Sequence, residues 1–224
     1  MLDPVPTSYD YHPPMDPYLS VVYADDDILV LDKPSGLLSV AGKDPALADC
    51  LAARANERFP GARIVHRLDK DTSGVMVLGL SKRAISGLGI QFEKRQTQKA
   101  YVARVWGAIA EPSGRIDLPL ATDWENKPRQ QVDFEHGRPA QTDWTVLDRE
   151  DGAVTRVKLV PRTGRTHQLR VHLLAIGHPI LGDAFYATGA ALAAANRLQL
   201  HAEELSFTHP GDGRMRDFVV PAPF

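Results

Sequence analysis

The apolar positions of the chain fall mostly in short runs that predict strands. Two runs near the N-terminus, LSVVY and ILVLDK, are separated by the turn-forming ADDD and predict a hairpin. From residue 98 onward, strand-like runs follow one another with Gly, Pro or charged turns between them. They are QKAYVARVWG, GRIDLPL, QQVDFEH, RPAQTDWTVL and AVTRVKLVP, followed by short strands near 198–208 and 216–220. Because strands outnumber helices, the pattern predicts an α+β fold with a large, mainly antiparallel mixed β-sheet flanked by helices.

Three segments have the periodicity and end signals of helices. The first, DPALADCLAARANERFPG at 44–61, has an Asp that can cap it and a Pro at the first helical position. The second begins after Ser81 and extends to about Arg95, and the third is THQLRVHLLAIG at 166–177. Between the first two helices, RIVHRLD and GVMVLGLS predict a pair of strands.

Composition narrows the class of protein. The 224 residues are 43% hydrophobic, which is enough for one domain with a real core. A single cysteine excludes an intramolecular disulfide framework, and no apolar run approaches the ~20 residues of a membrane span. Residues 1–17 are rich in Pro and Asp and contain no Lys or Arg, unlike a signal or transit peptide. We therefore expect a Pro-rich acidic N-terminal arm at 1–17, one domain at 18–224, and a cytoplasmic protein without a membrane segment.

The net charge of −2 conceals an uneven distribution. Residues 1–32 contain seven Asp and no Lys or Arg, which leaves 26 basic against 21 acidic residues in the rest of the chain. A net charge of +5 there gives modest support for an anionic partner, and a solvated acidic arm explains the asymmetry equally well.

The segment HRLDKDTSGVMVLGL at 66–80 places Asp69 between Arg67 and Lys70 at the start of an apolar run. A carboxylate beside such a run loses hydration and needs a cation or hydrogen bonds to stay ionised. Arg67 is a local candidate, although adjacent residues of an extended chain alternate in direction.

Arg170 is the stronger candidate partner for Asp69. It shares a helical face with Leu173 and Leu174, so its guanidinium also requires an anion. Such a pair would keep Asp69 oriented and ionised, as a nucleophile or a charge-stabilising carboxylate requires. A buried pair that only defines the fold accounts for these residues equally well.

Other residues near these elements could contact a base or a phosphate group. Tyr101 lies in a predicted strand and offers a ring that can stack on a base or a hydroxyl for proton transfer, although a strand Tyr is more often part of the core. The segment RVKLVPRTGRTHQLR at 156–170 has five basic residues and no acid, which suits phosphate contacts.

Two other interpretations are weaker. His167 and His172 are five positions apart on a predicted helix and have no accompanying Cys cluster, so we predict no metal site. Asp71 could pair with Asp69 as in a glycosidase, but it begins the turn-like DTSG, where an Asp usually bonds the backbone. Asp71→Ala is therefore expected to retain most activity.

Taken together, these motifs resemble the RluA family of pseudouridine synthases. HRLDKDTSG is similar to the family signature, and DKPSGLL, KAYVARVWG and GRTHQLRVHLLAIGHPILGD accompany it in the expected order. Asp32 departs from the family pattern, which usually has Asn before Lys-Pro. Many relatives carry an N-terminal S4-type RNA-binding domain. We expect none here, because the catalytic strands are predicted to begin by residue 19.

The resemblance implies roles for four residues. Asp69 corresponds to the catalytic aspartate, Tyr101 to the tyrosine that stacks on the target base, and Arg170 to the basic residue that pairs with the aspartate. Arg67 resembles the arginine that helps to extrude the uridine and fills its place.

The implied reaction isomerises uridine to pseudouridine and needs no metal or other cofactor. Asp69 would attack C1′ or help to remove the C2′ proton, and the sequence leaves both routes open. The implied substrates are structured RNA loops in 23S ribosomal RNA and in the anticodon stem-loop of tRNAs, because an unstacked uridine is easier to flip. We expect a monomer that needs no protein partner. A non-catalytic RNA-binding protein and a carboxylate-based hydrolase are the alternatives.

Overall fold

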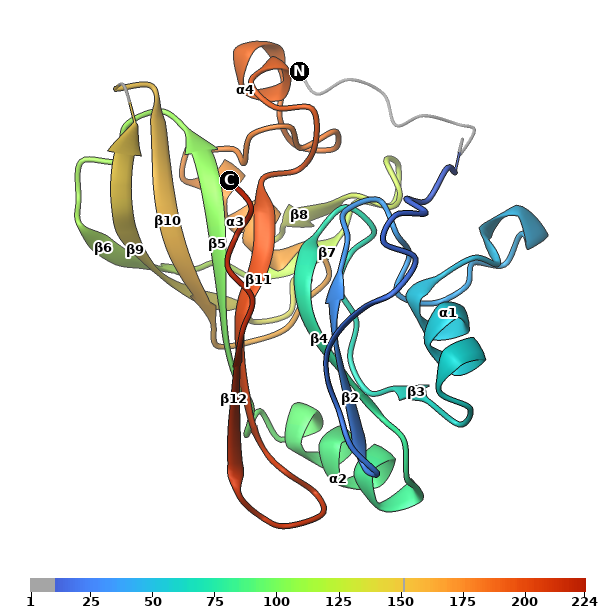
Figure 1. The fold of residues 1–224 in the computed structure, drawn as a ribbon. Coiled ribbons are helices and arrows are strands. Elements are labelled where there is room, and N and C mark those ends of the chain that lie inside the picture. Colours follow the sequence, from blue (N-terminus) through green and yellow to red (C-terminus); the bar gives the residue numbers. More distant parts are fainter. Residues whose placement is uncertain (1–10, 151) are drawn as a thin grey trace. The chain divides into compact units, whose positions relative to one another are not determined.

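The computed structural model describes residues 11–150 and 152–224, whose contacts gather in two compact units. The Asp69 unit comprises 11–99 and 201–223, and the Arg170 unit comprises the described part of 100–200 together with Phe224. Within the described residues, ten strands belong to the main mixed sheet, which confirms the predicted α+β class (Figure 1). Among the described residues, no helix is long and apolar enough to cross a membrane.

In the Asp69 unit, the strand order is β1-β2-β4-β11, with β3 on β4 and β12 on β11. The pairings are antiparallel except for a short parallel contact between β4 and β11. Every residue of β4 is buried, which explains its continuous apolar run. The elements are β1 (Ser20–Ala24), β2 (Ile28–Lys33), η1 (Pro45–Leu47), α1 (Leu51–Arg58), β3 (Arg63–Ile64), β4 (Ser73–Gly79), α2 (Lys82–Glu93), β11 (Leu200–Thr208) and β12 (Met215–Val219).

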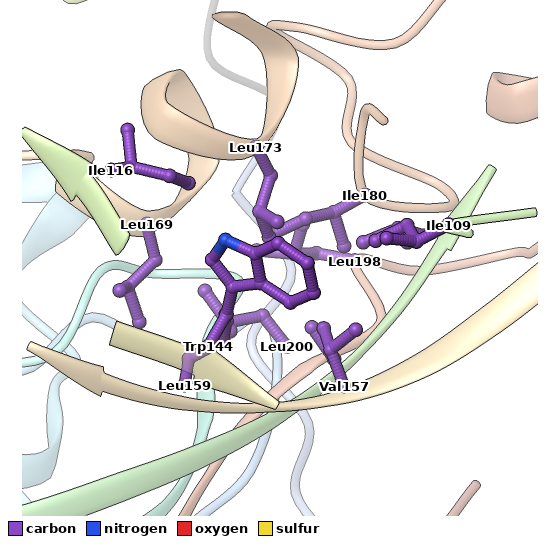
Figure 2. Close-up of a cluster of buried hydrophobic side chains, with 12 residues drawn as sticks. Ile109, Ile116, Trp144, Val157, Leu159, Leu169, Leu173, Ile180, Leu198 and Leu200 are labelled. Atoms are coloured by element: carbon purple, nitrogen blue, oxygen red, sulfur yellow. The ribbon is translucent and has the colours of Figure 1, made fainter. Parts of the chain in front are cut away.

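In the Arg170 unit, antiparallel strands follow the order β5-β10-β9-β6, and β7 and β8 form a separate two-stranded sheet. The core of this unit surrounds Trp144, which is 8% exposed and contacts apolar residues of the strands and of α3 (Figure 2). The elements are β5 (Gln98–Trp106), β6 (Ser113–Asp117), β7 (Leu120–Thr122), β8 (Gln130–Val132), β9 (Gln141–Glu150), β10 (Val154–Pro161), α3 (Gln168–Ala175) and α4 (Gly189–Ala193).

The first predicted helix, 44–61, is wrong as a single element. Asp44 does cap a helical turn, by accepting a bond from Ala46 N, but this turn is the short η1. The longer helix, α1, begins later, because Leu51 N donates to Leu38 O at 2.8 Å. In contrast, Ser81 caps α2 as predicted, with its Oγ accepting a bond from Ala84 N at 3.1 Å.

The described part of the predicted arm packs against α1. Arg54 has no exposed surface and donates to the carbonyls of Pro14 and Tyr18 at 2.7 and 3.0 Å. Its guanidinium also binds both carboxylate oxygens of Asp49. Tyr11 donates its hydroxyl to Asp49 O and accepts a bond from Leu38 N. Residues 1–10 of the arm lie outside the described residues, and the division at residue 17 stays a prediction.

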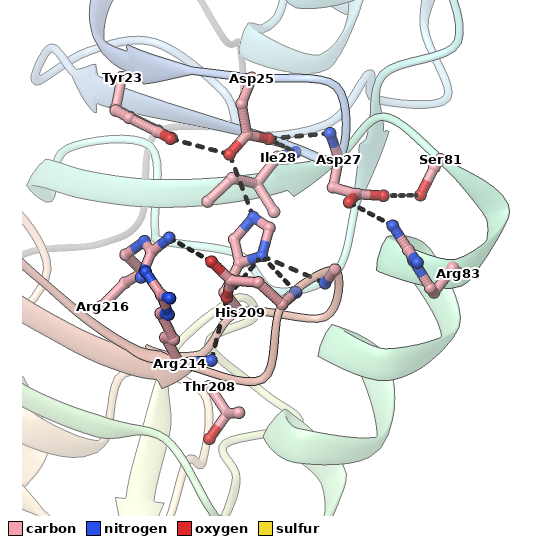
Figure 3. Close-up of polar contacts among 12 residues, drawn as sticks. Tyr23, Asp25, Asp27, Ile28, Ser81, Arg83, Thr208, His209, Arg214 and Arg216 are labelled. Atoms are coloured by element: carbon pink, nitrogen blue, oxygen red, sulfur yellow. Dashed lines mark hydrogen bonds and ion pairs between the residues drawn. The ribbon is translucent and has the colours of Figure 1, made fainter.

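A polar network joins the β1–β2 turn to the β11–β12 hairpin (Figure 3). His209 Nδ1 accepts backbone bonds from Gly211 and Asp212, so its Nε2 carries the proton and donates to Asp25 at 3.1 Å. Asp25 also accepts bonds from the backbone N–H groups of Asp27 and Ile28, each at 2.8 Å. These bonds lower the pKa of Asp25 against the opposing effect of its burial.

Candidate active site

Asp69 lies in a tight turn that leads directly into β4. The turn is closed by a bond from Thr72 N to Asp69 O at 3.2 Å, and β4 begins at the next residue, Ser73. The strand RIVHRLD predicted before it is shorter than expected, because β3 ends at Ile64. Asp69 is partly buried at the entrance to the most buried strand of its unit.

Lys33 anchors this turn from inside the protein. Its side chain has no exposed surface, and its ammonium donates to the carbonyls of Leu37, Lys70 and Pro34 at 2.6, 2.8 and 2.9 Å. Gly36 N also donates to Lys70 O, at 3.0 Å. In the sequence, Lys33 ends the strand predicted from ILVLDK and belongs to the motif DKPSGLL, and neither pattern predicted this role.

Two serines of the same segment fix the backbone on either side of Asp69. Ser35 Oγ donates to Asp71 O at 2.7 Å, and Ser39 Oγ donates to Leu68 O at 2.7 Å. Ser39 also accepts a bond from Leu68 N. Together with Lys33, these bonds fix the backbone next to Asp69 on both sides, which restricts where its carboxylate can point.

The start of β4 is fixed against β11 as well. Ser73 Oγ bonds His201 Nδ1 at 2.8 Å, and the other ring nitrogen of His201 bonds Val220 O at 2.9 Å. Gly74 has φ +117°, and a Cβ at this position would clash with the backbone of Ala202. Gly74 is therefore the residue that the close parallel contact between β4 and β11 requires.

Arg67 precedes the turn and is exposed, whereas its neighbour His66 is partly buried. The His66 ring stacks on Phe92 with centroids 4.2 Å apart, and its Nε2 accepts a bond from Val77 N at 3.1 Å. Burial, assisted by nearby Lys99, lowers the pKa of His66 to about 3. A neutral, anchored His66 thus fixes the backbone that presents the Arg67 side chain to solvent.

Arg170 lies on α3 and is 2% exposed. Its Nε and Nη2 donate to the two carboxylate oxygens of Asp183 at 2.8 and 2.6 Å. The ring centroids of Phe185 and Tyr186 lie 5.1 and 5.0 Å from the guanidinium carbon. The expectation that Arg170 needs an anion is met by Asp183, a residue that the sequence analysis missed within the motif HPILGD.

A second hydrogen-bond chain orients the start of α3. Gln168 Nε2 donates to Thr142 Oγ1 at 3.0 Å, and Thr142 bonds His172 Nδ1 at 2.9 Å. His172 Nε2 bonds Leu118 O at 3.0 Å and acts as the donor, so Nδ1 accepts from the threonine. Burial lowers the pKa of His172, which keeps the ring neutral.

Tyr101 lies in β5 opposite Leu159 of β10 and packs partly against the Trp144 core. Its role as a base-stacking residue stays a prediction. Asp69 and Arg67 belong to one unit, and Tyr101 and Arg170 belong to the other. The predicted pairing of Asp69 with Arg170 therefore also stays a prediction.

Comparison with known proteins identifies the family. The family model for RNA pseudouridylate synthase matches residues 27–175, and the chain belongs to this family. The protein is therefore an isomerase that converts uridine to pseudouridine in RNA, which confirms the predicted activity and substrate class.

Close relatives and solved structures agree with this assignment. The dual-specificity RNA pseudouridine synthase RluA of Salmonella typhi is 52% identical over 215 residues, covering 96% of this chain and 98% of the relative. The same-named protein of Escherichia coli K12 is 51% identical with the same coverage. The structure of human RNA Pseudouridylate Synthase Domain Containing 1 has a TM-score of 0.78 and 34% identity, covering 92% of this chain and 84% of the human one.

Proposed function

We propose that Asp69 is the carboxylate that acts on the ribose of the target uridine. The observation that carries this assignment is the immobilised turn, in which Lys33 and two serines fix the backbone around Asp69. Fixing the backbone reduces the entropy lost when a side chain is brought to a reacting atom. Asp69 also lies within the segment that matches the family model.

Three further residues would support the reaction. Arg170, oriented by Asp183, would stabilise the charge of Asp69, and Tyr101 would stack on the uracil ring. Arg67, exposed beside the turn, would enter the RNA and occupy the place of the flipped uridine.

The reaction breaks the bond from C1′ to N1 and forms one from C1′ to C5 after the uracil turns. N1 gains a proton and C5 loses one, so the atoms balance without an external oxidant, reductant or cofactor. Direct attack of Asp69 on C1′ and removal of the C2′ proton to give a glycal both fit an ionised carboxylate, and we favour the glycal route. A covalent ribosyl-Asp69 species that forms and decays at the rate of turnover would contradict this choice.

We further propose two substrate classes, a hairpin loop of 23S ribosomal RNA and the anticodon stem-loop of certain tRNAs. The words "dual-specificity" in the names of the relatives support two RNA classes. Loops also lower the cost of flipping a base. An enzyme with these substrates would act in the cytoplasm, as a monomer and without a protein partner.

Tritium release from RNA labelled at uracil C5 tests the assignment, with ribosomal RNA and tRNA prepared from cells that lack the enzyme. Wild type should release tritium from both RNAs, and Asp69→Asn should release none while still binding them. Asp71→Asn is the matched control, since its carboxylate is two positions away and forms a 3.5 Å ion pair with Lys70. Normal release by Asp69→Asn would overturn the proposed role of Asp69.

A further inference from the structure

His167 has an unusual backbone conformation at the start of α3. Its φ is +52° and its ψ is +18°, which lie in the left-handed region, and the residue is 9% exposed. Among the described residues, Arg95 is the only other non-glycine residue with a positive φ, and Arg95 is exposed. A Cβ in the left-handed region crowds the neighbouring backbone, so this conformation costs free energy. A buried residue that keeps such a conformation is a candidate for a functional role.

The usual requirements of a helix start do not explain this conformation. The residue before the first helical turn normally has an extended backbone, and its side chain accepts a bond from the backbone of the helix. His167 occupies this place in α3, but its ring bonds the hydroxyl of Tyr186 through Nδ1 at 2.7 Å instead. The left-handed backbone of His167 therefore directs the imidazole towards a residue 19 positions further along the chain.

The imidazole helps to fix the positions of two aromatic side chains. The Tyr186 hydroxyl accepts a bond from Gln130 N at 2.8 Å in addition to its bond with His167, and Tyr186 is 2% exposed. The His167 ring also contacts the Tyr186 ring edge-on, with centroids 5.6 Å apart, and stacks on Phe185 with centroids 5.7 Å apart. His167 thus restricts where the rings of Phe185 and Tyr186 can lie.

These two residues in turn hold Arg170. Their ring centroids lie 5.1 and 5.0 Å from the guanidinium carbon. Their backbone N–H groups donate to Asp183 at 3.0 and 3.2 Å, and Asp183 accepts two bonds from the guanidinium. The orientation of the guanidinium therefore depends on where Phe185 and Tyr186 lie, and through them on His167.

We propose that His167 is a positioning residue for the isomerisation of uridine. Its ring holds Phe185 and Tyr186 in place, and these two residues keep the Arg170 guanidinium in the orientation that the reaction requires. The inference rests on the proposed function, since it affects turnover only if Arg170 acts on the charge of Asp69. In this role His167 acts through Arg170 and does not bind the uridine.

Single-turnover kinetics test the proposal. Enzyme in saturating excess over RNA labelled with tritium at uracil C5 gives the rate constant of the reaction. His167→Asn is the informative variant, because asparagine also tolerates a left-handed backbone but lacks the imidazole ring. The rate constant should fall about tenfold or more, since small displacements of a catalytic group have large effects on rate. RNA affinity, measured in the Asp69→Asn background so that turnover does not disturb it, should stay within about twofold.

Two further variants separate positioning from a general loss of stability. Tyr186→Phe removes only the hydroxyl that His167 binds, and it should also lower the rate constant. His178→Gln changes a partly buried histidine of the same unit, whose Nδ1 bonds Trp106 O at 3.0 Å. This control should leave the rate constant within about twofold of wild type. Thermal unfolding of each variant identifies a temperature at which all of them are folded.

A double-mutant cycle with Arg170→Lys tests whether the effect passes through the guanidinium. Lysine keeps the positive charge but cannot bind a carboxylate through two parallel bonds. Arg170→Lys alone should therefore lower the rate constant. Adding His167→Asn to this variant should lower it by no more than about twofold further, because the group that His167 positions is already absent.

Three outcomes would contradict these assignments, each in a different way. An unchanged rate constant in folded His167→Asn, together with a slow Arg170→Lys, would overturn the positioning role and leave the role of Arg170 intact. The same tenfold loss in the wild-type and Arg170→Lys backgrounds would also overturn it, because His167 would then act independently of Arg170. Full activity of Arg170→Lys would instead refute the proposed function of Arg170, and with it the basis of this inference.

Discussion

Asp183 binds Arg170 through two hydrogen bonds, one from Nε and one from Nη2, and neither side chain is more than 2% exposed. The carboxylate also accepts bonds from the backbone N–H groups of Phe185 and Tyr186 at 3.0 and 3.2 Å. The guanidinium is therefore fixed in one orientation before any substrate binds. This arrangement suits a residue that has to position another charge.

Removing Asp183 should be costly. Asp183→Ala leaves a buried cation without this partner and should lower the free energy of unfolding by ~3–5 kcal/mol. Urea unfolding at pH 7 measures the change, and Asp217→Ala, an exposed carboxylate of β12, is the control. A loss below about 1 kcal/mol would show that the pair contributes little to stability.

Lys33→Met should affect both stability and activity. The substitution preserves most of the side-chain volume but removes the ammonium donor of three carbonyl groups. Lys70 O keeps its bond from Gly36 N, so the cost of ~1–3 kcal/mol per buried unsatisfied group applies to Leu37 O and Pro34 O. It should also lower kcat, because the turn that carries Asp69 loses its internal anchor. Lys43→Met, at an exposed position, should change neither quantity. Full activity of folded Lys33→Met would separate the anchor from catalysis.

The depressed pKa of His66 makes stability depend on pH. The ordinary pKa of about 6.5 applies to the unfolded chain, so below pH 6.5 the unfolded state binds a proton that the folded state accepts only near pH 3. The contribution is complete above pH 6.5 and is lost as the pH falls. Between pH 6.5 and 4, wild type should lose up to ~3 kcal/mol more than His66→Gln. Parallel pH profiles of the two proteins would contradict this assignment.

Two glycines should respond in opposite directions to substitution by alanine. Gly74→Ala combines a positive φ with a clash against the backbone of Ala202 and should cost about 3 kcal/mol or more. Gly89 lies inside α2, and a Cβ there would meet nothing within 4 Å. Gly89→Ala should therefore stabilise the protein by ~0.5–1 kcal/mol. Thermal unfolding of both variants provides the comparison, and equal effects would exclude the local explanation.

The strands were predictable wherever their burial produced a regular pattern. ILVLDK corresponds residue for residue to β2, and AVTRVKLVP differs from β10 by a single residue. Each of these strands has a neighbouring strand on both sides. Their apolar residues are therefore stable only when buried, and burial is what the apolar pattern predicts. The helix α4 was missed because GAALA carries no amphipathic pattern and no charge that marks a helix end.

Local sequence could not predict the breaks that distant residues impose. The helix expected at 44–61 is divided where Leu51 N bonds Leu38 O instead of following a helical pattern from Asp44. The strand expected to reach Asp69 stops early, and Lys33 and Ser39 bind the carbonyls that follow. Such choices depend on tertiary hydrogen bonds, which composition and periodicity do not record.

The sequence was sufficient to predict the reactive residues of the candidate site but not the buried residues that hold them in place. The motif HRLDKDTSG singled out Asp69, and the apolar surroundings of Arg170 indicated that it needs an anion. The buried partners could not be recognised in advance, since a lysine 36 positions before Asp69 and an aspartate 13 positions after Arg170 look like ordinary surface residues in the sequence. Lys33 and Asp183 have no exposed surface in the folded protein, and this burial cannot be recognised from the sequence.

The reactivity of Cys50, the single cysteine of the chain, reports how often the native structure opens locally. Cys50 Sγ caps α1 by accepting a bond from Ala53 N at 3.4 Å, and the residue is 2% exposed. A thiol reagent can reach it only when the structure around the start of α1 opens. The rate of alkylation, followed by mass spectrometry with and without RNA, therefore measures how often this local opening occurs in the native enzyme, without any engineered label.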